Sequence, residues 1–331
     1  MALDRIKFQP GLSMPEFFRL FGTEVLCSAA LQSTRWPDGF CCPGCGAAAH
    51  RILHSSGNKV FQCNACRRQT PLIAGTVFQS TKLPLTTWFL AVYLVSQAKT
   101  GLSALALKRQ LGVSYPTVWL MHHKLMQAMT EREARYTLSG KVQVDDAYLG
   151  GERFGGKVGR GSENKVAFVA AVSLTDAGRP LWVRLSMVVG FKLKSIADWA
   201  SKCLAAGSGV QCDGLACFSV VTQVGCRYES TVVAGRKPKD VHQFQWINTV
   251  LGNLRTSLSG GNHSFGSRKY AAQYLGVFAC RFNPRFDLQT LPQRLLAAIA
   301  RCGAHSQHLI RTVAEVHCES SRALTQGSAW K

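Results

Sequence analysis

Two Cys-x-x-Cys pairs near the start of the chain constrain its fold more than any other feature. Cys42 and Cys45 form the first pair, and after 17 intervening residues Cys63 and Cys66 form the second. Four thiolates at this spacing are typical of one tetrahedral Zn²⁺. Four protein ligands leave no open coordination position, so the predicted zinc is structural. Cys41 could replace Cys42 only by spoiling the two-residue spacer, and two coincidental reduced pairs are the alternative.

The remaining cysteines form no second paired motif, and we expect them to be buried thiols. The longest apolar run, Trp88 to Val95, is far too short to cross a bilayer, and no secretory signal is visible. Thirteen cysteines without an export signal argue against a disulfide scaffold and favour an intracellular location. The eight thiols in question are Cys27, Cys203, Cys212, Cys217, Cys226, Cys280, Cys302 and Cys318.

Length and charge indicate several domains and a polyanionic partner. A chain of 331 residues predicts two or three domains. Its net charge of +21 and pI near 9.8 point to nucleic acid. Residues 1–140 carry 15 Lys and Arg against 6 Asp and Glu, and residues 141–331 carry 24 against 12. Because the excess is spread out, we expect both halves to touch the partner.

Helical patterns surround the cysteine pairs. A helix is predicted over residues 13–34 with Ser13 as its N-cap, and a buried helix over residues 83–98. A helix ending near Leu111, a turn at Gly112 and a second helix from Ser114 to about Met129 have the pattern of a helix-turn-helix. An ordinary helical hairpin is the alternative. Candidate DNA contacts are Lys108, Arg109, Tyr115, Thr117, His122, His123 and Lys124.

The second half of the chain has an α/β pattern. The strand-like runs cover residues 142–149, 166–174, 180–189, 210–212 and 229–233, and the helical runs cover residues 196–206 and 241–258. This order predicts a ribonuclease-H-like α/β fold. The expected domains are an N-terminal helical segment (1–34), a zinc ribbon (35–75), a helix-turn-helix region (80–135), the catalytic domain (140–287) and a C-terminal helical tail (288–331).

Oxygen-bearing side chains recur at the ends of these predicted elements. An Asp145-Asp146 pair lies in the first strand, Asp213 follows the fourth strand, and Asn248 lies in the late helix. Carboxylate and amide oxygens are the ligands that Mg²⁺ and Mn²⁺ prefer. Two such ions about 3.5–4 Å apart support phosphodiester chemistry. Side chains alternate along a strand, so only one of Asp145 and Asp146 is expected to face the metals.

Several motifs resemble one known family over residues 10–285. They are RWPDGFCCPGCG, CNAC, LALKRQLGVSYPTVW, VQVDDAYLGGE, VGRGSENK, CDG, FQWINTVLGNLRTSLSG and YLGVFACRFN. Together they are similar to bacterial insertion-sequence transposases with an N-terminal zinc ribbon and a DDE (ribonuclease-H/integrase-like) catalytic domain.

The resemblance implies a role for particular residues. The family's metal ligands fall on Asp145, Asp213 and Asn248, and its basic helical residue falls on Arg255, seven positions later on the same helix face. Asp146 ranks behind Asp145. Asn248 departs from the usual Glu, and Gly276 stands where members often carry an acid, which puts a contribution from that site in doubt. A surface Asn is the alternative for position 248.

Other polar groups are weaker candidates. Lys157, Arg160 and Lys165 lie in a Gly-rich basic segment that is expected to hold DNA phosphates, with a solvated loop as the alternative. His263 is a further candidate DNA contact, and His242 is an alternative metal ligand near Asn248.

The resemblance implies a transposase that binds terminal inverted repeats and catalyses metal-dependent strand cleavage and strand transfer. It would work as a homodimer or larger assembly on double-stranded DNA, in the bacterial cytoplasm at the nucleoid. No covalent protein–DNA intermediate is needed. The alternative is a non-enzymatic regulator in which the zinc ribbon and helix-turn-helix still bind DNA but the catalytic domain has decayed.

Overall fold

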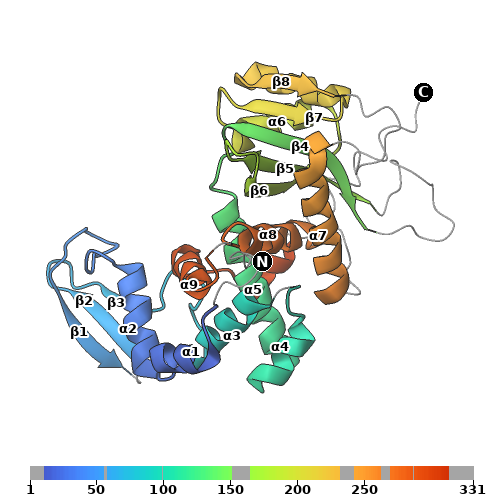
Figure 1. The fold of residues 1–331 in the computed structure, drawn as a ribbon. Coiled ribbons are helices and arrows are strands. Elements are labelled where there is room, and N and C mark those ends of the chain that lie inside the picture. The colour runs from blue at the N-terminus through green and yellow to red at the C-terminus, as the bar shows by residue number, and fades with distance from the viewer. Residues whose placement is uncertain are drawn as a thin grey trace, which may run out of the picture. The chain divides into compact units, whose positions relative to one another are not determined.

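The computed structural model describes residues 11–55, 58–98, 100–150, 165–231, 242–261, 269–285 and 287–312. Two compact units make up the chain. The N-terminal unit contains residues 1–129 together with 284–307, and the sheet unit contains residues 130–283 together with 308–331. Figure 1 labels the elements of both. Within the described ranges, no helix has the length and apolar character needed to cross a membrane.

The N-terminal unit begins with two short helices instead of one. α1 (Met14–Phe21) is capped by the Ser13 hydroxyl, which accepts from the Glu16 N–H at 3.3 Å. Gly22 ends α1, and Thr23 caps α2 (Glu24–Arg35) by accepting from the Leu26 N–H. The predicted Ser13 cap is confirmed. The single helix over 13–34 was wrong, because Gly22 and Thr23 supply a stop and a new start within it.

A three-stranded antiparallel ribbon follows, in the order β1 (His50–Ser55), β2 (Asn58–Cys63), β3 (Gln69–Pro71). Its small core is aromatic: Trp36, Phe40 and Phe61 lie with ring centroids 4.7–5.2 Å apart. Arg35 lies over the Trp36 ring at 4.5 Å and donates to the carbonyls of Pro71 and Leu72. The end of α2 is therefore fastened to the end of β3.

Helices complete the N-terminal unit. α3 (Leu85–Gln97) is buried along much of its length, as predicted for residues 83–98. α4 (Ala104–Leu111) ends at Gly112, which is left-handed at φ 67°, and α5 (Tyr115–Glu133) follows Ser114. α9 (Leu291–Arg301) packs against α2 and α3. Part of the expected C-terminal tail is thus built into the N-terminal unit, which the sequence did not indicate.

The sheet unit contains a five-stranded sheet in the order β6-β5-β4-β7-β8. β4 (Lys141–Leu149), β5 (Val166–Leu174) and β6 (Pro180–Met187) form an antiparallel series. β7 (Gly209–Cys212) lies parallel to β4, and β8 (Arg227–Ser230) lies parallel to β7. Two parallel neighbours require crossover connections, which α6 (Leu193–Cys203) and the 3₁₀ helix η1 (Ala216–Val224) provide.

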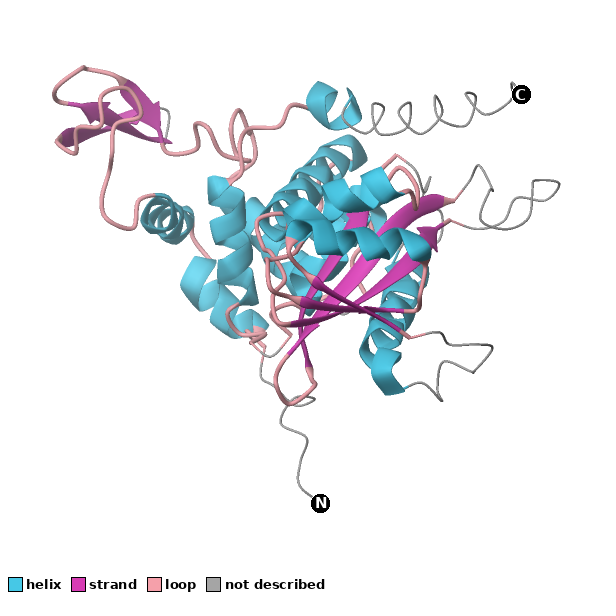
Figure 2. Cartoon of the chain, turned by 90° about the horizontal axis from the view of Figure 1, so that it is seen from above, coloured by secondary structure: helices cyan, strands magenta, loops and turns pink. Residues whose placement is uncertain are grey.

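Helices cover both faces of this sheet (Figure 2). On one face α6 and η1 bury Val142 and Val144 of β4. On the other face, α7 (Gln245–Gly261), preceded by the 3₁₀ turn η3 (His242–Phe244), and α8 (Ala271–Phe282) pack on β5 and β6. Burial on both sides explains why β5 reads as a nearly continuous apolar run.

Candidate metal sites and nucleic-acid interface

The four cysteines of the predicted zinc site meet at the base of the ribbon. One Sγ atom of each of Cys42, Cys45, Cys63 and Cys66 lies within 4.8 Å of all the others. The Cys42–Cys66 and Cys45–Cys63 sulfur pairs are 3.5 and 3.6 Å apart. A tetrahedron with Zn–S bonds of about 2.3 Å has edges of about 3.8 Å, so the donor set fits Zn²⁺. Cys41 is exposed, lies outside the cluster and donates to the Gly46 carbonyl.

Backbone N–H groups already favour negative charge on this cluster. The Gly44 N–H donates to Cys42 Sγ at 3.4 Å and lowers the pKa of Cys42 to about 6. The N–H of Cys66 similarly lowers the pKa of Cys63. For Cys45 the Ala47 N–H lowers the pKa, but the thiols of Cys66 and Cys63 outweigh it and raise the pKa to about 12. Four thiolates therefore need a cation to coexist.

The two Cys-x-x-Cys turns have matching backbones. Gly46 N–H donates to the Cys42 carbonyl and Arg67 N–H donates to the Cys63 carbonyl, at 2.9 and 3.1 Å. The residue after each second cysteine is left-handed, with φ of 75° at Gly46 and 62° at Arg67. Glycine adopts this conformation without a Cβ penalty, whereas arginine does not. Arg67 therefore holds a strained position in the second turn.

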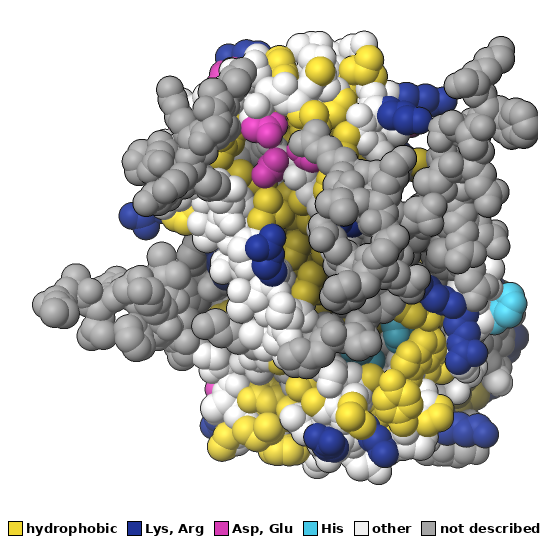
Figure 3. All heavy atoms as spheres, turned by 90° about the vertical axis from the view of Figure 1, so that its right-hand side faces the viewer, with side chains coloured by type: hydrophobic (Ala, Val, Ile, Leu, Met, Phe, Trp, Pro, Cys, Tyr) yellow, Lys and Arg dark blue, Asp and Glu magenta, His cyan; other side chains and the backbone are white. Residues whose placement is uncertain are grey.

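A second cluster forms where β4 and β7 lie side by side. β4 pairs with β7 only over Lys141 to Gln143, and β7 ends at Cys212. Asp213 follows directly, so it lies level with the middle of β4. Carboxylate oxygens of Asp145, Asp146 and Asp213 all lie within 4.8 Å of one another, and all three residues are partly exposed. Figure 3 shows acidic side chains gathered at one place on this face.

The expectation that only one member of the Asp145-Asp146 pair could face the cluster was wrong. The two side chains do start from opposite faces of β4: Asp145 shares a face with Gln143, while the charge of Asp146 reaches Cys217 of η1. Beyond Gln143, however, β4 pairs with none of the described residues on its β7 side. Both carboxylates can lean over that open flank, and strand alternation no longer separates them.

The negative charge of the acidic cluster acts on neighbouring groups. Burial is the first cause that raises the pKa of Cys212, and the charges of Asp213 and Asp145 add to it. The Asp213 Oδ1 accepts a hydrogen bond from the Leu215 N–H at 3.3 Å, which orients this one of its two carboxylate oxygens. Carboxylates this close repel one another. Oxygens around one Mg²⁺ lie about 3–4 Å apart, so small side-chain rotations make the donor set fit a divalent cation.

Gln143 fixes α7 on the same face of β4 as Asp145. Its buried amide accepts from the Ile247 N–H at 3.1 Å and donates to the Gln243 carbonyl. The first turn of α7, which carries Asn248, therefore lies against β4 two residues from Asp145. Sequence reasoning missed Gln143, although a polar residue at a buried position of an apolar strand was a signal that it has a partner.

The other predicted site residues are spread over several elements, and some lie outside the described residues. Arg255 is exposed on α7, about 10.5 Å along the helix from Asn248. Lys165 is partly buried immediately before β5, and His242 begins η3. Lys157, Arg160, His263 and Cys318 lie outside the described residues. The seven other thiols expected to be buried are all buried.

Gly276 has a packing role, not a role in the acidic cluster. It is buried in α8, and a Cβ built on it would lie 2.3 Å from Thr130 Oγ1 and 2.7 Å from Thr130 Cα. Real Cβ atoms essentially never approach that closely. Only glycine lets α8 and the end of α5 come together here, so the missing acid at this position is a consequence of close packing.

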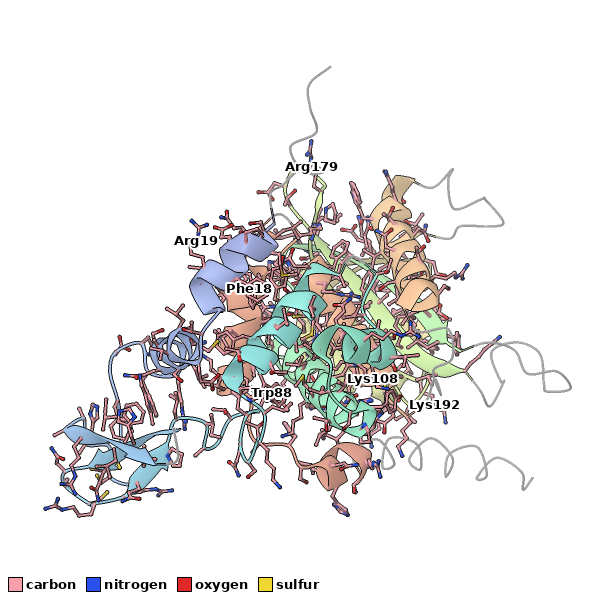
Figure 4. All side chains as sticks on the ribbon, turned by 90° about the horizontal axis from the view of Figure 1, so that it is seen from below. Phe18, Arg19, Trp88, Lys108, Arg179 and Lys192 are labelled. Atoms are coloured by element: carbon pink, nitrogen blue, oxygen red, sulfur yellow. The ribbon has the colours of Figure 1, made fainter. Side chains whose placement is uncertain are left out.

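Exposed basic and aromatic groups lie around the turn between α4 and α5. Lys108 (labelled in Figure 4), Arg109 and Tyr115 are exposed, and the Thr117 hydroxyl bonds to that of Ser114 at 2.8 Å. The expectation for Lys124 needs correction. Its side chain is buried and donates to the Val77 carbonyl at 3.1 Å, and burial lowers its pKa.

His122 and His123, also suggested as DNA contacts, are buried as well. The exposed face of α5 therefore ends within its first turns. Only the N-terminal end of this helix presents the predicted contacts to solvent.

Two family models match parts of the chain that contain these clusters. Residues 22–69 match the family model described as a transposase zinc-ribbon domain, and residues 137–283 match the ISXO2-like transposase domain. A Halobacterium salinarum protein, described as an uncharacterized protein in transposable element ISH50, is 31% identical over 134 residues. That alignment covers 40% of this chain and 44% of the relative, so the chain spans under half of its length. The predicted resemblance to insertion-sequence transposases is therefore confirmed for the zinc-ribbon region and for the transposase domain.

Proposed function

We propose that this protein is a DNA transposase of an insertion sequence, which binds terminal inverted repeats and carries out strand cleavage and strand transfer. The observation that carries the proposal is the meeting of Asp145, Asp146 and Asp213 at the open flank of β4. In the described sheet, β5 runs antiparallel to the other four strands. This order supports a ribonuclease-H-like catalytic domain over residues 140–287.

Asp145, Asp213 and Asn248 are the proposed ligands of two divalent ions, Mg²⁺ or Mn²⁺, with Asp146 close enough to contribute. When bound, such ions lower the pKa of water or a 3′-hydroxyl and stabilise charge at the phosphate. Gln143 holds the start of α7 so that Asn248 stays beside β4. Arg255, two turns further along α7 and exposed, is the proposed contact to a DNA phosphate.

DNA recognition is assigned to the N-terminal unit. Between Asp38 and Glu131 the sequence contains no acidic residue. Most of the zinc ribbon (35–75) and of the helix-turn-helix region (80–135) therefore carries positive charge without an acidic residue between. Lys108, Arg109 and Tyr115 supply exposed contacts at the turn between α4 and α5. Because two element ends must be joined to one target, the active assembly contains at least two copies.

The test is cleavage of a labelled duplex that carries the terminal repeat flanking the gene, with Mg²⁺ or Mn²⁺. Asp145→Asn and Asp213→Asn should each lower the rate at least about 100-fold, since even groups behind metal ligands cost 10- to 100-fold. Asn248→Ala should cost less, because a neutral ligand is lost, and Asn248→Glu should retain activity. Repeat binding should be unchanged in all four.

The matched control is Asp198→Asn, which makes the same charge change at an exposed position of α6. Full cleavage by Asp213→Asn would overturn the assignment of the site. Repeat binding with no cleavage by the unaltered protein, under either metal, would instead favour the DNA-binding regulator.

A further inference from the structure

Next to the acidic cluster, the connection between β6 and α6 forms a basic and apolar surface. Residues 189–194, Val-Gly-Phe-Lys-Leu-Lys, are called the 189–194 segment here. Val189 and Leu193 are exposed by 58% and 57%, values unusual for apolar residues, and Lys192 and Lys194 are exposed beside them. Lys192 is labelled in Figure 4. No acidic residue occurs between Asp176 and Asp198.

Backbone pairing places this segment at the acidic cluster's end of the sheet. The Val188 N–H donates to the Ala167 carbonyl at 3.1 Å, and Ala167 pairs with Tyr148 of β4. The chain leaving β6 therefore lies level with the last residues of β4. Phe191 completes the link, because its ring packs edge-on against Tyr148 with centroids 5.4 Å apart.

Tyr148 connects the segment to the carboxylates. It lies two residues after Asp146 on the same face of β4, about 7 Å further along the strand. Phe191 is partly buried against the core on that face and partly exposed, so one side of its ring is anchored. A fixed aromatic pair with flanking lysines thus adjoins the cluster of Asp145, Asp146 and Asp213.

We infer that the 189–194 segment and Tyr148 hold the DNA strand next to the phosphate that is cut. Lys192 and Lys194 bind backbone phosphates on either side of the aromatic pair, and Phe191 and Tyr148 contact an unpaired base. Lysine contacts to phosphate and aromatic contacts to bases are the two recurring features of single-strand binding. This inference rests on the proposed function, because it takes the acidic cluster as the place of cleavage.

The inference is tested by measuring how tightly the full-length protein binds two DNA probes. Mg²⁺ and Mn²⁺ are left out so that no strand is cut. One probe is a fluorescein-labelled terminal-repeat duplex with blunt ends, and the other carries six unpaired bases. With the second probe, the double variant Lys192→Ala/Lys194→Ala should make the negative slope of log K against log salt shallower by about 1.4–1.8, because two phosphate contacts are lost. Lys141→Ala/Lys202→Ala is the matched control, since both lysines are exposed at the other ends of β4 and α6.

Phe191→Leu keeps an apolar side chain but removes the ring. It should weaken binding of the probe with unpaired bases by about 5- to 100-fold while blunt-duplex binding stays within about twofold. A melting curve matching that of the unaltered protein shows that the fold is intact.

The inference fails if the lysine pair behaves as its control, or if Phe191→Leu weakens both probes equally. Failure of the proposed function looks different. In that case the unaltered protein binds the probes but does not cut them when metal is added, whatever the 189–194 variants do.

Discussion

Gly276→Ala should destabilise the sheet unit by about 1–2 kcal/mol net, and the structure gives the reason. The added Cβ would lie 2.7 Å from Thr130 Cα, against 3.4 Å or more for an ordinary contact, so α8 and the end of α5 must separate by about 0.7 Å. The Thr130 hydroxyl, 2.3 Å away, can rotate, but the backbone atom cannot. Overpacking of this kind costs about 1–3 kcal/mol, and the better helix propensity of alanine returns up to about 1 kcal/mol.

Gly252→Ala provides a matched control. Gly252 is also helical, in α7, but a Cβ there meets nothing within 4 Å. Only the helix propensity changes, so this variant should stabilise by about 0.5–1 kcal/mol. For a unit of this size the melting temperature shifts by about 2–4 °C per kcal/mol. Differential scanning calorimetry should therefore show a fall of about 2–8 °C for Gly276→Ala and a rise of about 1–4 °C for Gly252→Ala.

Thr130→Ala in the Gly276→Ala background removes the hydroxyl but leaves the backbone of residue 130 in place, and should recover only part of the loss. Equal shifts in Gly276→Ala and Gly252→Ala would refute the reasoning, because they would show that α8 and α5 do not pack as closely as described. Complete recovery by Thr130→Ala would show that the hydroxyl alone sets the limit.

Three further predictions concern the cysteines and the ribbon. Cys63→Ser should lose the single Zn²⁺ per chain and unfold the ribbon, whereas Cys41→Ser should keep it, as measured by elemental analysis. Arg67→Gly should relieve about 1 kcal/mol of left-handed strain and slow zinc loss to a chelator; faster loss would refute this. Iodoacetamide at pH 7.5 should label Cys41 in the zinc-loaded protein. It should spare Cys27 and Cys280, whose pKa values burial raises to about 12, and mass spectrometry would detect early labelling of either, which contradicts the prediction.

Most of the helices and strands could be predicted from the sequence, because short-range features such as capping residues and turns determine where they begin and end. Gly112 ends α4 and Ser114 precedes α5, as the turn and capping residues indicated, and the structure adds Ser103 as the cap of α4. The cysteine spacing likewise led to the correct four sulfurs. The split between α1 and α2 was also readable, since Gly22-Thr23 is a stop followed by a cap, but the apolar pattern on both sides concealed it.

Long-range features could not be predicted from the same signals. The burial of Lys124 depends on the Val77 carbonyl, 47 residues away in sequence, which no local pattern around α5 announces. The position of α9 against α2 and α3 is similar, because its partners precede it in sequence by about 200 residues or more. The close packing of Gly276 is of the same kind, because its neighbour, Thr130, lies in another helix.

The acidic cluster depends on where a strand stops, more than on which face its residues occupy. Alternation along β4 separates Asp145 from Asp146, and it would keep them apart if β7 ran beside β4 for its full length. β7 instead ends at Cys212, after only three paired positions. Its short length brings Asp213 level with the aspartate pair and leaves the flank that both carboxylates need. Extending β7 past Cys212 would fill that flank with backbone, so the end of this strand is itself part of the proposed metal site.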